Sequence, residues 1–129
     1  MTNFHAYVFA GLVLAGSAGV AHAQDAALGE KVFFKCKVCH QIGEGAKTIV
    51  GPELNGLNGR KTGSVEGYSY SEANKGSGIV WSEEEFKKYI TNPQAVIPHT
   101  KMIFSGLPKE TDRDNLWAFL SQFKADGTK

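Results

Sequence analysis

The chain has 129 residues, the length of one small domain. Its 14 lysines and arginines almost balance 13 aspartates and glutamates, so the overall charge gives no argument for nucleic-acid binding. Abundant glycine and the lack of extended β-branched runs predict a loop-rich helical protein. Such a small chain buries little core by itself, so a large apolar cofactor would act as part of that core.

The first 23 residues resemble a secretory signal. They carry no charged side chain, residues 4–20 are largely apolar, and Ala21-His22-Ala23 matches a cleavage site. No Lys or Arg precedes the apolar stretch, which leaves an uncleaved membrane anchor as the alternative. The stretch is short and poor in Leu and Ile for a spanning helix of ~20 residues. We therefore expect cleavage after Ala23 and a mature domain over residues 24–129.

A first helix is predicted to begin after Asp25, a good capping residue. Leu28, Gly29, Val32 and Phe33 recur at helical spacing and predict one apolar face. Glycine lowers helix stability, so Gly29 is expected to permit a close crossing with another helix.

This helix leads into Cys36-x-x-Cys39-His40, the pattern that attaches a c-type haem. Two thiols at this spacing can add to the two vinyl groups of one haem, and the adjacent imidazole reaches the iron. A thioredoxin-like redox pair would need a βαβ context, and no strand pattern precedes the motif. A zinc site needs about four N or S ligands. Outside the leader only these three residues and His99 could supply them, so a haem is the favoured interpretation.

Loops and short helices are predicted for the rest of the chain. Residues 41–64 lack periodicity and are expected to wrap a cofactor edge. Helices are predicted to start at Ser71 and at Ser82, the latter with a capping box and an end before Pro93. Residues 94–108 are expected to be irregular. A capping box at Thr111 predicts a last helix that packs on the first.

Met102 is the candidate for the sixth iron ligand, because a thioether suits Fe(II) and Met/His ligation raises the haem potential. Taken alone, a methionine between Lys101 and Ile103 is more often a core filler. An open sixth position would instead bind small molecules.

From Cys36 to Leu120 the chain resembles the class I cytochrome c family, above all the small bacterial cytochromes c2 and their mitochondrial relatives. The spacing between motifs makes the match specific. The matching segments are CKVCH (36–40), GPELNGL (51–57), GRKTG (59–63), YSYSEAN (68–74), Trp81, YITNP (89–93) and PHTKMIF (98–104).

The resemblance implies an all-α fold, with three main helices and loops around one covalent haem c. Pro52 would accept the Nδ1 proton of His40, and Met102 would bind the iron while Tyr89 donates toward its sulfur. Other residues would supply hydrogen-bond donors to the haem or shield its edge from solvent. They are Arg60, Tyr70 and Trp81 at a buried propionate, Asn74 and Thr100 in a polar network, and Phe104 at the haem edge.

Two departures from the family stand out. His99 occupies a position that is usually glycine, and it could compete for iron when the Met102 loop loosens. The lysine ring around the haem edge is thinner than in mitochondrial forms, so weaker steering by acidic partners would follow. Lysines that match it are Lys31, Lys35, Lys101 and Lys109, whereas Ile49, Gln94, Ala95 and Pro108 stand where lysine is frequent.

The resemblance implies a monomeric periplasmic electron carrier that is not an enzyme and binds no nucleic acid. It would run between a cytochrome bc1-type quinol-oxidising complex or a dehydrogenase and an oxidase or a photosynthetic reaction centre. Two rivals remain: a five-coordinate haem enzyme or gas sensor, and a haemless redox or zinc-binding module.

Overall fold

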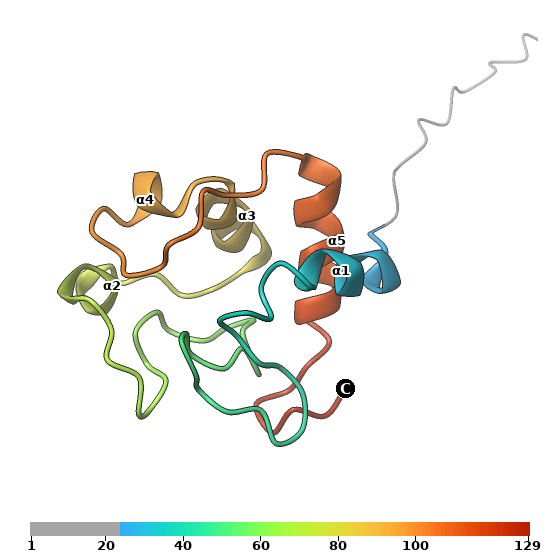
Figure 1. Cartoon of the computed structure of the whole chain (residues 1–129), viewed down its shortest axis with the longest axis horizontal. Coiled ribbons are helices and arrows are strands. Elements are labelled where there is room, and N and C mark those ends of the chain that lie inside the picture. Colours follow the sequence, from blue (N-terminus) through green and yellow to red (C-terminus); the bar gives the residue numbers. More distant parts are fainter. Residues whose placement is uncertain (1–23) are drawn as a thin grey trace, which may run out of the picture.

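Five helices joined by long loops make up the part of the chain that the computed structural model describes, residues 24–129 (Figure 1). The predicted leader, residues 1–23, lies outside it. Residues 24–129 contain no strand beyond one isolated antiparallel bridge between Lys61 and Val80. None of the helices described is long and apolar enough to cross a membrane. The helices are α1 (Ala26–Phe33), α2 (Glu72–Gly76), α3 (Glu83–Thr91), α4 (Pro93–Val96) and α5 (Glu110–Leu120).

The main scaffold is the crossing of α1 over α5, visible in Figure 1. Asp25 caps α1 by accepting from the backbone nitrogens of residues 27 and 28. Gly29 is buried at the crossing, where an added Cβ would lie 1.8 Å from the carbonyl oxygen of Asn115. Phe33 packs on Phe119 with ring centroids 5.4 Å apart. The predicted close crossing at Gly29 and the packing of the last helix on the first are both confirmed.

The first helix differs from the prediction in two details. Leu28 was placed on the buried face, but 45% of it is exposed, whereas Gly29 and Phe33 are the residues of α1 that are buried. The helix also ends at Phe33, before the cysteines. Hydrogen-bonded turns continue in its place: the nitrogens of Cys39 and His40 both donate to the Cys36 carbonyl, at 3.0 and 2.9 Å.

Helix starts follow the predicted caps at Ser71 and Ser82, which accept from the nitrogens of Asn74 and Glu85. The capping box at Thr111 was wrong. The nitrogen of Arg113 already bonds the Lys109 carbonyl, so Thr111 lies inside α5.

Pro93 both ends α3 and begins α4, a short helix that the sequence analysis took as irregular chain. Asn92 caps it through its side chain, accepting from the nitrogen of Ala95. The preset backbone angle of proline suits a first helical position, and this favours the new start.

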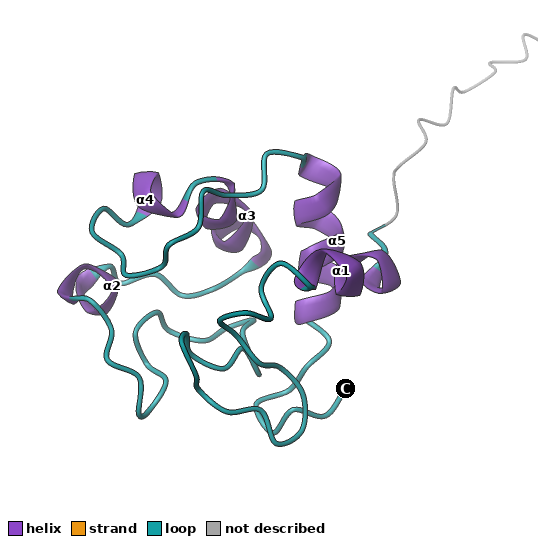
Figure 2. Ribbon diagram, in the orientation of Figure 1, coloured by secondary structure: helices purple, strands orange, loops and turns teal. Residues whose placement is uncertain are grey.

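No helix occurs in residues 41–64, as predicted, or from there to Ser71, and these loops form the lower part of the molecule in Figure 2. Aromatic side chains of α3 and α5 complete the core. Phe86 lies 5.3 Å from Trp117, and Tyr89 lies 5.1 Å from Trp81, between ring centroids. The loops together with α2, α3 and α5 enclose a cavity.

Candidate haem site

The cavity has a volume of about 440 Å³ and is lined by residues between Lys35 and Leu120. No Asp or Glu lines it. Its walls bring together every side chain that the sequence analysis assigned to the cofactor. These are Cys36, Cys39, His40, Pro52, Arg60, Tyr70, Asn74, Trp81, Tyr89, Thr100, Met102 and Phe104.

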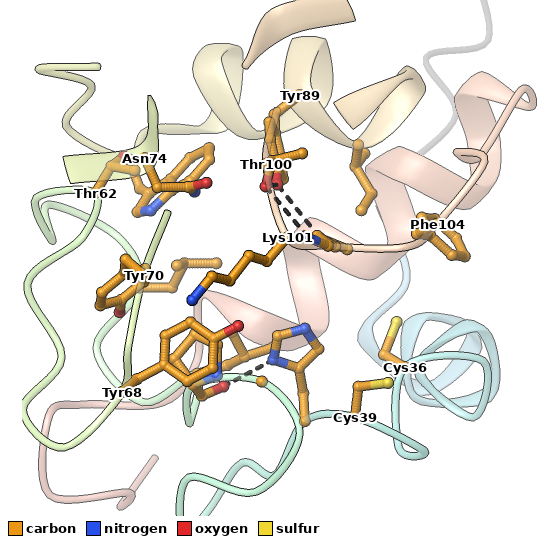
Figure 3. A pocket seen from close by; sticks show the side chains of 18 of the residues that line it. Cys36, Cys39, Thr62, Tyr68, Tyr70, Asn74, Tyr89, Thr100, Lys101 and Phe104 are labelled. Carbon is orange, nitrogen blue, oxygen red and sulfur yellow. Dashed lines mark hydrogen bonds between the residues drawn. The ribbon is translucent and has the colours of Figure 1, made fainter. Parts of the chain in front are cut away.

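Cys36 and Cys39 are both free thiols at the wall of this cavity (Figure 3). The turns that follow α1 place them one after the other: the nitrogens of Cys36 and Lys37 donate to the Phe33 carbonyl, and those of Cys39 and His40 donate to the Cys36 carbonyl. Burial raises the pKa of the Cys36 thiol to about 11, so it stays protonated at neutral pH. Two thiols one turn apart are the arrangement that two thioether links to one haem require.

The ring of His40 is fixed by its neighbours. Its Nδ1 lies 2.7 Å from the carbonyl oxygen of Pro52. A carbonyl only accepts, so Nδ1 carries the proton and Nε2 keeps its lone pair for a metal. Burial is the main cause that lowers the His40 pKa, which favours the neutral imidazole. Gly51 makes room for the ring: a Cβ there would lie 2.5 Å from its Cε1.

The thioether of Met102 also lines the cavity and is held by a closed set of hydrogen bonds. The Tyr89 hydroxyl donates to Met102 Sδ at 3.4 Å and lies 3.3 Å from Thr100 Oγ1, which accepts from the Met102 nitrogen at 3.3 Å. Burial raises the pKa of Tyr89 and keeps it a neutral donor. In Figure 3 the Tyr89–Thr100 pair lies on one side of the cavity and Cys39 on the other.

The segment that carries Met102 is tied to the protein at several points. Gln94 Nε2 donates to the carbonyls of Thr100 and Met102, at 3.1 and 3.4 Å. Lys101 reaches across the cavity, as Figure 3 shows, and its Nζ donates to the Ser69 carbonyl at 2.7 Å. His99 is the one non-glycine residue among those described with positive φ, +69°, which explains why glycine is usual there.

Arg60 and Tyr70 lie on the cavity wall with part of their hydrogen-bonding capacity already used. Arg60 Nη1 donates to the carbonyls of Glu53 and Asn55, at 2.9 and 3.0 Å, and lies 3.6 Å from the Glu53 carboxylate. Burial lowers the Arg60 pKa, while Glu53 opposes that shift. The Tyr70 oxygen accepts from the nitrogen of Val65 at 3.1 Å. Its own O–H proton and the other Arg60 N–H groups are the donors that a carboxylate in the cavity could use.

Thr62 is a cavity residue that the sequence analysis missed. Within residues 24–129, its Oγ1 is the only buried side-chain N or O atom without a hydrogen-bond partner. Buried hydroxyls normally have hydrogen-bond partners, so this oxygen indicates a position where a polar group of a ligand would bind. A haem propionate could supply this polar group. The residues that line the cavity therefore fit a haem. The available signal was position: Thr62 lies in the matching segment GRKTG, two residues after Arg60.

Of the four lysines predicted to surround the cavity, two line it and two do not. Lys35 and Lys101 line it, and so does Lys61, which was not predicted. Lys31 lies instead in a second groove, with Asp25 and with the acidic residues Asp112 and Asp114 of α5. Lys109 lines neither cavity. Across the described residues, no three His, Cys, Asp or Glu side chains come together as a metal site.

A family model described as cytochrome c matches residues 26–124. The chain belongs to the cytochrome c family. It is 62% identical to cytochrome c2 of Rhodoblastus acidophilus, over 83% of this chain and 100% of that relative. It is 59% identical to cytochrome c-554 of Methylosinus trichosporium, over 93% and 92% of the two chains. Cytochrome cH from Methylobacterium extorquens superposes with a TM-score of 0.70 and 39% identity, covering 74% of this chain and 96% of that one.

Membership identifies the fold as that of a class I cytochrome c similar to the bacterial cytochromes c2. The chain therefore carries a covalently bound haem c with iron, and its coarse function is electron transport. This confirms the family, the fold class and the cofactor that were predicted from the sequence.

Proposed function

We propose that this chain carries single electrons in the periplasm through a haem c whose iron is bound by His40 and Met102. The observation that carries the proposal is the hydrogen bond from Tyr89 to Met102 Sδ, on the wall of the cavity that the His40 ring also lines. A methionine that only fills a core needs no donor at its sulfur. The bound group would supply an iron that alternates between Fe(III) and Fe(II).

The chain's own residues would hold and tune that group. Cys36 and Cys39 would fix it covalently. Pro52 would keep the His40 lone pair directed at the metal, and Tyr89 would hold Met102 in place. Thr62, Arg60, Tyr70 and Trp81 would supply donors for a propionate, since a buried carboxylate without donors is very costly. Asn74, Thr100 and Phe104 would complete the polar network and the cover of the site.

The carrier function also implies a cellular location and redox partners. We propose removal of residues 1–23 and release of residues 24–129 as a monomeric periplasmic domain. Its donors would be a cytochrome bc1-type complex or a dehydrogenase, and its acceptors an oxidase or a photosynthetic reaction centre.

The test is to add exported holoprotein to washed membranes of the producing organism. We expect a mature chain that begins at Gln24, carries one haem, and restores electron flow from quinol to the terminal oxidase. The physical reason is a closed, six-coordinate iron that exchanges electrons and not ligands. Rapid CO binding with peroxidase turnover, and no restored flow, would identify a five-coordinate enzyme or sensor instead.

Substitution of Thr62 by Val tests the propionate site. The change keeps the shape and removes the hydroxyl. If Oγ1 bonds a propionate, the holoprotein should lose about 1.5–3 kcal/mol of unfolding free energy in a guanidinium titration, the usual size for a bond to a charged group.

Thr91→Val is the matched control, because its hydroxyl donates to the Lys87 carbonyl on an exposed part of α3. It should change stability by less than about 0.5 kcal/mol. A Thr62→Val protein as stable as the wild type, or more so, would show that the hydroxyl has no partner in the holoprotein.

A further inference from the structure

The segment that carries Met102 makes few main-chain contacts with the rest of the protein. Within the described residues, no backbone–backbone hydrogen bond involves residues 101–106. Such bonds resume at the nitrogens of Thr100 and Leu107, on either side of this stretch. Ile103, in its middle, is 99% exposed. Segments with so few backbone bonds open locally at low cost, so side chains must hold Met102 in place.

Gln94 donates to two carbonyls of this segment. Its Nε2 lies 3.1 Å from the Thr100 carbonyl oxygen and 3.4 Å from the Met102 carbonyl oxygen. An amide NH2 group has two N–H bonds, so one hydrogen can serve each carbonyl. No other donor in residues 24–129 bonds either carbonyl. One side chain thereby holds the peptide groups before Lys101 and after Met102.

Gln94 can act as an anchor because α4, on which it stands, is itself held in place. Its neighbour Pro93 is among the fully buried side chains, and Ile97 is 2% exposed. The Ile97 nitrogen donates to the Pro93 carbonyl at 2.9 Å and closes the short helix. The two bonds from Gln94 therefore connect a fixed part of the core to a segment that has few bonds of its own.

The other bonds between this segment and its surroundings act through the segment's own side chains. Tyr89 donates to the sulfur of Met102, and Lys101 Nζ donates to a carbonyl across the cavity. Because both side chains are long and unbranched, the backbone can shift while these bonds persist. Among the described residues, Gln94 is the one side chain outside residues 100–106 that bonds the main chain of this stretch.

We infer that Gln94 is a positioning residue for the sixth iron ligand: by holding these two carbonyls it keeps Met102 in the cavity and limits how often the sixth position opens. The inference rests on the proposed binding of the iron by His40 and Met102. Lysine is frequent in the family at the position of Gln94, so the resemblance does not imply this restraint. A ligand from solution can bind only the open form, so its apparent affinity is proportional to the population of that form.

Titration of the ferric holoprotein with imidazole at neutral pH measures that population, because imidazole that replaces Met102 removes the sulfur-to-iron charge-transfer band. Gln94→Met keeps the length of the side chain and removes both donors. The imidazole concentration that removes half of the band should fall about tenfold, which corresponds to about 1.4 kcal/mol, as expected for two partly exposed hydrogen bonds. Gln94→Glu keeps the shape, but its carboxylate oxygens only accept, so the two carbonyls would be repelled and the fall should be larger.

The matched controls are Gln122→Met and Gln122→Glu. Gln122 is exposed, as Gln94 is, but its side chain makes no hydrogen bond within the described residues. Both controls should keep the wild-type affinity for imidazole. An equal fall in the Gln94 and Gln122 variants would overturn the inference, because the effect would then not depend on the two carbonyls.

Wild-type imidazole affinity in both Gln94 variants would also overturn the inference and leave the carrier function standing, since Met102 would then be held without this side chain. Wild-type affinity in Gln94→Glu alone would show that Gln94 acts through its shape and not as a donor, which contradicts the inference as well. If the wild-type ferric protein has no charge-transfer band to lose, Met102 is not the ligand. The proposed site at His40 and Met102 then fails, and the inference with it.

Discussion

Met102→Ala should leave the haem attached and lower the reduction potential by on the order of a few tenths of a volt, within the ~0.8 V range that axial ligands span. Attachment survives because Cys36 and Cys39 are untouched. The potential falls because a neutral thioether favours Fe(II), and a water in its place does so less. Potentiometric titration and the ferric spectrum measure both effects. The sulfur-to-iron charge-transfer band should disappear, and CO should bind the reduced protein rapidly.

Tyr89→Phe is the graded control for that experiment. It removes the hydroxyl that donates to Met102 Sδ and contacts Thr100, but leaves the sulfur in place. We expect the charge-transfer band to persist and the potential to shift much less than in Met102→Ala. If the Met102→Ala protein keeps the wild-type spectrum and potential, Met102 is only a core side chain. The carrier function then loses its main support.

The attachment site could be predicted because its chemistry is local in sequence. Cys36, Cys39 and His40 lie within five consecutive positions, and their spacing alone limits what they can bind. Pro52 is already a longer step, since the bond to His40 Nδ1 spans twelve residues. It was anticipated only because the family resemblance supplied the register. The same holds for Tyr89 and Met102, thirteen residues apart.

What the sequence analysis missed depends on how distant segments meet. Thr62 gains its meaning from being buried in the cavity without a protein partner, which no local pattern records. Lys31 seemed to belong with Lys35, four residues away, yet the turns after α1 separate them: one faces the acidic groove and the other the cavity. Leu28 fits an apolar helical face, but the side of α1 that meets α5 is that of Gly29 and Phe33, and Leu28 is 45% exposed.

The capping prediction at Thr111 failed for a related reason. A serine or threonine followed three residues later by an acidic side chain signals a helix start only if the chain enters there. The chain enters α5 at Lys109, after Leu107 and Pro108, whose carbonyls accept from Arg113 Nη1 at 2.8 Å. The Arg113 side chain, about one turn into α5, thus binds the segment that precedes the boundary.

Gly29→Ala should destabilise the holoprotein, although helix propensity alone predicts the opposite. Alanine in place of glycine favours a helix by about 0.8–1.0 kcal/mol. At Gly29, however, the new Cβ would lie 1.8 Å from the Asn115 carbonyl oxygen and 2.8 Å from the Phe119 Cβ. Since backbone on α5 cannot yield locally, α1 must move away and weaken the Asp25–Asn115 hydrogen bond of 2.9 Å. Overpacking of this kind costs ~1–3 kcal/mol.

The chain supplies its own control in Gly76, the last residue of α2. An added Cβ there meets nothing within 4 Å, and its φ is not positive. Gly76→Ala should therefore stabilise the protein by about 0.4–1 kcal/mol through the unfolded state. Guanidinium unfolding of both variants, with the haem attached, gives the two signs directly. If Gly29→Ala also stabilises, α1 and α5 can separate at no cost, and the crossing is not what positions the cysteines that follow α1.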